Sequence, residues 1–119
     1  GPNATTTIYK GNSSWSLYGV EQYQREMLAN GPIEVAFTVY SDFPAYKGGV
    51  YSRTAGTSVL GGHAVKMVGW GVLNGVPYWK VANSWNKGWG MDGYFLIKRG
   101  VDECGIETSG VAGSPALPA

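Results

Sequence analysis

The pair Asn74-Gly75 is the feature that most constrains how this chain can fold. It lies between two runs of mostly strand-forming residues, His63–Trp70 and Val76–Ala82. Because Asn and Gly both readily take the positive φ angles of a tight hairpin turn, the pair predicts two antiparallel strands joined by that turn. Two more runs of the same kind, Ile33–Tyr40 and Gly93–Lys98, indicate that the sheet has further strands.

One amphipathic helix is expected ahead of these strands. Apolar side chains recur with helical spacing on one face, at Val20, Tyr23, Met27 and Leu28, and the residues between them are polar or charged. The helix should end at Asn30-Gly31-Pro32, because Gly accepts the left-handed conformation of a helix end and Pro lacks the N–H needed to continue. The fold class that follows is α+β, mostly a strongly bent antiparallel sheet with one helix.

The composition fits one soluble globular domain. The chain has 119 residues, of which 44% are apolar and 14% charged, and its 19 glycines and 5 tryptophans favour strands and turns over a helical bundle. Nine basic and eight acidic side chains give a formal net charge of +1 without any run of Lys or Arg. We therefore expect neither nucleic acid nor a membrane as a partner, and no apolar stretch approaches the roughly 20 residues of a membrane helix.

The chain divides into three segments. Residues 1–18 are rich in Thr, Ser and Asn and are expected to form an extended lead-in, residues 19–113 the strand-rich domain, and residues 114–119 an unstructured tail. Within the domain, residues 41–60 contain Pro and several Gly and are expected to form a long loop.

Cysteine and glycosylation signals differ in what they indicate about the compartment. The single cysteine, Cys104, cannot form an internal disulfide and gives no sign of an oxidising environment. Asn3 and Asn12 each begin an Asn-x-Ser/Thr pattern in a polar segment, which makes them candidate glycosylation sites of a secreted protein. No metal site is expected, because zinc needs three or four ligands and this chain has one His and one Cys.

His63 is the only histidine, and it opens one of the two strands that the hairpin joins. Asn83 follows the other strand, so the hairpin should bring these two side chains together. Taken alone, a histidine beside an apolar strand is more often a hydrogen-bonded core residue than a catalyst. An Asn oxygen nevertheless suits a catalytic histidine, since it can hold one ring N–H without adding a charge. Trp85 would either cover that bond or simply pack in the core, and the pattern favours neither.

The strings around these residues resemble the His and Asn regions of papain-like cysteine proteases, in the family's order. They are Gly61-Gly62-His63-Ala64, Gly69-Trp70-Gly71, Pro77-Tyr78-Trp79, Asn83-Ser84-Trp85 and Gly88-Trp89-Gly90. A second set is similar to cathepsin B rather than to cathepsin L or papain: Asn30-Gly31-Pro32-Ile33-Glu34, Val39-Tyr40-Ser41-Asp42-Phe43, Tyr46-Lys47 and Cys104-Gly105-Ile106-Glu107. The resemblance runs from about Gly19 to Gly113.

The resemblance implies a papain-like fold, in which this chain is the right-hand, antiparallel β-barrel-like domain with one amphipathic helix. The helical domain that bears the nucleophilic cysteine would be absent from this chain. By the same resemblance, His63 is the general base and acid paired with a thiolate, Asn83 orients its imidazole, and Trp85 shields their bond. The substrates would be proteins and peptides, and no cofactor is implied.

Three further residues match positions of the family's S2 pocket, which receives the substrate side chain second from the scissile bond. Ala36 and Ala64 match residues that line this pocket, and Ser109 stands where cathepsin B has an acid. Loss of that carboxylate removes the usual partner of a basic substrate residue and favours apolar side chains.

The resemblance also implies partners and a compartment. The family's nucleophilic cysteine, the glutamine of its oxyanion hole and the occluding-loop histidines of cathepsin B lie upstream, and nothing in this chain matches them. Cys104 matches a structural cysteine instead. The partners would then be the N-terminal, Cys-bearing half, cystatin-type inhibitors and a propeptide, in a lysosomal or secreted protein. The alternative is a non-catalytic fragment or binding module that keeps the protease surface.

Overall fold

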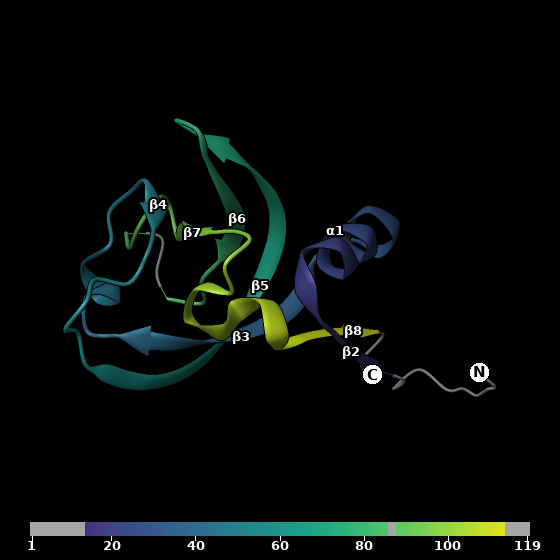
Figure 1. Cartoon of the computed structure of the whole chain (residues 1–119), viewed down its shortest axis with the longest axis horizontal. Helices are drawn as coiled ribbons and strands as arrows, with labels where there is room; N and C mark the ends of the chain where they lie inside the picture. Colours follow the sequence, from purple (N-terminus) through teal and green to yellow (C-terminus); the bar gives the residue numbers. More distant parts are fainter. Residues whose placement is uncertain (1–13, 86–87, 114–119) are drawn as a thin grey trace.

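The computed structural model describes residues 14–85 and 88–113. These residues form one α-helix, two short 3₁₀-helices and seven strands (Figure 1). In chain order the elements are β2 (Ser14–Leu17), α1 (Gly19–Asn30), β3 (Ile33–Tyr40), η1 (Phe43–Ala45), β4 (Val50–Tyr51), β5 (Val59–Leu73), β6 (Val76–Ala82), β7 (Tyr94–Lys98), η2 (Glu103–Thr108) and β8 (Gly110–Gly113). No helix in these ranges is long and apolar enough to cross a membrane.

The described strands make one open sheet in the order β2-β8-β3-β5-β6-β7-β4. Neighbouring strands are antiparallel except β4 and β7, which run parallel. Strand β5 has 15 residues and pairs with β3 over its first part and with β6 over its second, so the sheet curls around the core (Figure 1). The α+β fold with a bent, mainly antiparallel sheet is confirmed, and the parallel β4–β7 pair was not anticipated.

The hairpin between β5 and β6 forms as predicted. Asn74 and Gly75 have φ angles of 52° and 81°, and Leu73 pairs with Val76 across the turn. Both central residues therefore take the positive φ that this type of turn requires. The loop expected at residues 41–60 is wrong in part, because it contains η1, β4 and the start of β5.

Helix α1 packs on the sheet through a narrower face than its sequence suggests. Tyr23 and Met27 are buried, one turn apart, whereas Leu28 is 78% exposed. The prediction that Leu28 shares the packed face is wrong, because it lies about 100° around the helix from Met27. The Gly31 N–H closes the helix on the Met27 carbonyl at 3.0 Å, with φ at 94°.

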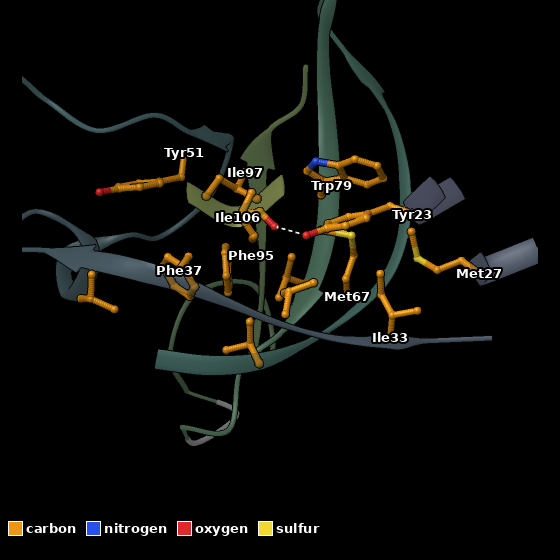
Figure 2. Packing of buried hydrophobic residues seen from close by; sticks show 14 of the residues in the cluster. Tyr23, Met27, Ile33, Phe37, Tyr51, Met67, Trp79, Phe95, Ile97 and Ile106 are labelled. Carbon is orange, nitrogen blue, oxygen red and sulfur yellow. Dashed lines mark hydrogen bonds between the residues drawn. The ribbon is translucent and has the colours of Figure 1, made fainter. Parts of the chain in front are cut away.

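The core lies inside the curve of the sheet and is closed by α1 and η2 (Figure 2). The Tyr23 hydroxyl donates to the Ile106 carbonyl at 2.7 Å and accepts the Ser109 N–H at 3.1 Å, which ties α1 to the end of η2. The largest fully buried side chains include Trp79, Tyr23, Phe43, Phe95 and Met67.

Glu107 is the buried charged side chain of this core, with 6% of its surface exposed. Its carboxylate accepts hydrogen bonds from Trp79 Nε1 at 3.0 Å, from the Gly100 N–H at 2.6 Å and from the Asp102 N–H at 3.2 Å. These three donors offset the desolvation of the charge, so Glu107 anchors the turn before η2 to β6.

Candidate active site

The structure brings His63 and Asn83 together. His63 lies on β5 opposite Phe37, and Asn83 follows β6, where its N–H donates to the Gly93 carbonyl at 3.0 Å. The two side chains meet with 2.8 Å between His63 Nε2 and Asn83 Oδ1. Both are partly buried.

The neighbouring backbone decides which atom donates in this contact. The Ser84 N–H also points to Asn83 Oδ1, at 2.8 Å, and a backbone N–H can only donate. Oδ1 is therefore the amide oxygen, and His63 Nε2 must carry a proton and donate it. His63 Nδ1 makes no hydrogen bond to the described residues. When Nε2 carries the ring proton, the lone pair of Nδ1 is available to accept a proton.

Two aromatic rings lie next to the imidazole. Trp85 stacks on His63 with ring centroids 5.5 Å apart and 24° between the planes, and Phe37 lies 6.1 Å away. Trp85 is still 39% exposed. It also packs against the core residue Phe43 at 5.6 Å, so it contacts both the imidazole and the core.

A hollow of about 220 Å³ opens beside this pair. It is lined by Val39, Pro44, Leu60, His63 and Trp85, together with glycines 61–62. Sequence reasoning did not name Val39, Pro44 or Leu60 as residues of the site. Strand alternation would have placed Val39 on the same side as Phe37 and so beside His63, whereas nothing local indicated that the segment carrying Pro44 folds over the site.

The three residues matched to the S2 pocket also lie close together, on the other face of the sheet from His63. Ala36 on β3 pairs with Ala64 on β5. Ser109 Oγ accepts the Ala36 N–H at 3.0 Å and donates to the Ala36 carbonyl, so its hydroxyl is bonded to β3. Ala64 is exposed and lines a second hollow, of about 400 Å³, whose walls include Asn83 and Ser84.

Cys104 has the environment of an unreactive thiol. It lies in η2, half-buried, with its Sγ 3.7 Å from Glu103 Oε2. Burial, together with the carboxylate of Glu103, raises the pKa of this thiol to about 12. Within the described ranges, no three His, Cys, Asp or Glu side chains are grouped as metal ligands.

Some expectations fall on residues outside the described ranges. They are the glycosylation candidates Asn3 and Asn12, most of the lead-in at residues 1–18, and the tail at residues 114–119. The described part of the lead-in is residues 14–18. Ser14–Leu17 form β2, an extended strand that pairs with β8, and Tyr18 follows it.

The chain belongs to the papain family of cysteine proteases, whose family model, "Papain family cysteine protease", matches residues 3–114. Its relatives include Cathepsin B-like cysteine proteinase 5 of Caenorhabditis elegans, 69% identical over 98 residues, which are 82% of this chain and 28% of that protein. Cathepsin B-like cysteine proteinase 6 of the same organism is 58% identical over 106 residues, 86% of this chain and 28% of that protein.

Solved structures agree with this assignment. Procathepsin B S9 from Trypanosoma congolense has a TM-score of 0.84 and 53% identity, over 94% of this chain and 38% of that one. Digestive procathepsin L 3 of Tenebrio molitor has a TM-score of 0.72 and 29% identity, over 86% of this chain and 34% of that one. The cathepsin B-like resemblance is confirmed, and the chain spans less than a third of the length of the two relatives named above.

Proposed function

We propose that this chain is the His- and Asn-bearing part of a cathepsin B-like peptidase, in which His63 is the general base and acid. The observation that carries the proposal is the 2.8 Å bond from His63 Nε2 to Asn83 Oδ1, which leaves Nδ1 free. A histidine held in this way has one fixed donor and one available base, as proton transfer to and from a thiol requires.

The reaction would begin with transfer of the thiol proton to His63 Nδ1. The thiolate then attacks the carbonyl carbon of the scissile peptide, and the imidazolium returns the proton to the leaving amine nitrogen. Water next attacks the thioester, losing a proton to Nδ1, and the acid product leaves as the thiol is regenerated. Asn83 accepts from Nε2 throughout, and Trp85 limits access of water to that bond.

The nucleophile of this scheme would come from residues outside this sequence. Cys104 is the only cysteine here, and a thiol with a pKa of about 12 is almost fully protonated at neutral pH. By itself, the 119-residue chain is therefore expected to be inactive. In the alternative reading, the chain is a non-catalytic fragment or binding module, which would bind partners through the same surface.

The substrates would be proteins and peptides with an apolar residue at the S2 position. Ala36, Ala64 and Ser109 lie together and carry no carboxylate themselves, while Glu34 and Lys66 both line the hollow that Ala64 shares. The likeness to a procathepsin B supports a propeptide as a further partner. The same proposal includes two other partners, cystatin-type inhibitors and the Cys-bearing half, and a lysosomal or secreted location.

A thiol-directed activity probe tests the proposal on the full-length protein. We expect the probe to label one cysteine outside residues 1–119, at the same rate in the Cys104→Ser variant, and to lose that label in His63→Ala. Peptide mapping by mass spectrometry identifies the labelled cysteine. Labelling of Cys104, or undiminished labelling of His63→Ala, would show that the assignment is wrong.

A further inference from the structure

The ring that stacks on His63 is itself held by a second layer of aromatic side chains. Phe43, in η1, is fully buried and lies 5.6 Å from Trp85 and 4.9 Å from Trp89. Trp85 and Trp89 meet edge to face at 5.0 Å, so the three rings form a closed triangle. Trp85, which is 39% exposed, thus has its buried side set by Phe43 and Trp89.

Phe43 also packs against Phe37, the second aromatic neighbour of the histidine. It packs edge to face on Phe37 at 5.1 Å, and Phe37 lies 6.1 Å from His63. One buried side chain therefore contacts both aromatic neighbours of the imidazole without touching substrate or the reacting atoms.

Trp89 fixes the position of η1 relative to these rings. Its Nε1–H donates to the Pro44 carbonyl at 3.0 Å, next to Phe43 in the chain. This hydrogen bond connects the segment after Asn83 to the segment after β3, which are far apart in sequence. Loss of this bond would free η1 to shift and would loosen the packing behind Trp85.

We propose that Phe43 and Trp89 are positioning residues for catalysis, which act on His63 through Trp85 and Phe37. The inference rests on the proposed function of His63. Small displacements of a catalytic group are costly, because proton transfer needs the donor and acceptor in line. A shifted Trp85 would also admit water to the His63–Asn83 bond and weaken it.

The test uses full-length protein whose active sites are counted with an irreversible thiol-directed inhibitor, so that misfolded molecules do not contribute to the rates. We expect Phe43→Leu to lower kcat per counted site about tenfold, with a smaller change in KM. The rate of alkylation by iodoacetamide, which needs the imidazole but no bound substrate, should fall in parallel. Trp89→Phe, which keeps a ring but removes the Nε1–H donor, should give a smaller loss in both.

Ile97→Ala is the matched control. Ile97 is fully buried on β7 and pairs with Trp79 and Tyr51. Tyr51 reaches Phe43 at 5.1 Å, but neither partner makes a ring contact with Trp85, Phe37 or His63 among the described residues. It should lower the melting temperature while leaving both rates per counted site within about twofold of the wild type. Equal rates in Phe43→Leu and Ile97→Ala would overturn the inference.

Including His63→Ala, with its rate expressed per folded molecule because the inhibitor is not expected to label it, separates this inference from the proposed function. If His63→Ala is inactive but the two aromatic variants behave like Ile97→Ala, only the positioning role is wrong. If His63→Ala is as active as wild type, the proposed function is wrong. Should Phe43→Leu not fold, Trp89→Phe decides alone, since unchanged kcat per site and alkylation rate would contradict the role of its hydrogen bond.

Discussion

At the scale of single residues, the site is defined by which atoms can still donate or accept. Asn83 Oδ1 accepts both the Ser84 N–H and the His63 ring, while Asn83 Nδ2 is buried without a hydrogen-bond partner among the described residues. The amide is thus held entirely through its oxygen. An acidic residue at this position would add a buried charge beside the imidazole, which Asn avoids.

Ser109 gives a prediction about specificity. In the full-length protein, Ser109→Glu should raise kcat/KM for Arg relative to Phe at the second substrate position by about tenfold, because a carboxylate offsets desolvation of the guanidinium. Thr108→Glu is the matched control, since it adds the same charge on an exposed neighbouring side chain and should change the ratio little. A strong preference for Arg in the wild type would mean that another acid serves the pocket.

Cys104 gives a prediction about pH. With its pKa raised to about 12, the thiol should not react with iodoacetamide at pH 8 in the folded protein, and its alkylation should rise only as the pH approaches 12. Mass spectrometry after timed alkylation measures this, with urea-unfolded protein as the reactive control. Rapid modification of folded Cys104 at pH 8 would contradict the buried environment described above.

At the scale of secondary-structure elements, local signals were read correctly from sequence and distant pairings were not. The Asn74-Gly75 turn specifies its own geometry, and the meeting of His63 with Asn83 follows from the hairpin it forms. The β2–β8 and β4–β7 pairs join segments far apart in the chain, and β4 has only two residues, too few for a recognisable pattern. The packing of η1 against Trp85 was missed because these two segments are also far apart in the chain.

Glu107 gives a prediction about the stability of these elements. Glu107→Ala would leave three donors without an acceptor beside Trp79, and we expect a loss of about 3 kcal/mol in the free energy of unfolding. Urea unfolding of the full-length protein measures it. Glu21→Ala, which removes an exposed ion pair with Arg25, should have little effect. Equal effects of the two substitutions would show that the Glu107 network is not stabilising.

At the scale of the whole molecule, the chain exposes apolar side chains next to the site. Val59 and Leu60, at the start of β5, are 62% and 59% exposed, and Trp85 lies nearby across the hollow. Under the proposed function, the face around His63 would meet the Cys-bearing part of the protein. A patch of this kind on a separate domain usually marks an interface.

The 119-residue chain by itself should therefore associate or fold poorly, and should not cleave peptides. Light scattering measures its size, and a fluorogenic peptide measures its activity. Addition of the upstream, Cys-bearing segment should restore cleavage that thiol reagents block. A stable monomer that cleaves peptide without that segment would contradict two claims: that the nucleophile lies outside this sequence, and that Cys104 is unreactive.

The most direct test of the central claim is kcat/KM of the full-length protein and its His63→Ala variant on one peptide, per folded molecule. Loss of the only base in the proposed scheme should lower kcat/KM by at least about a thousandfold. Asn83→Ala, which keeps the base but loosens its orientation, should retain more activity, with a loss of about ten- to a hundredfold. Activity of His63→Ala equal to that of the wild type would contradict the assignment of His63 as the catalytic base.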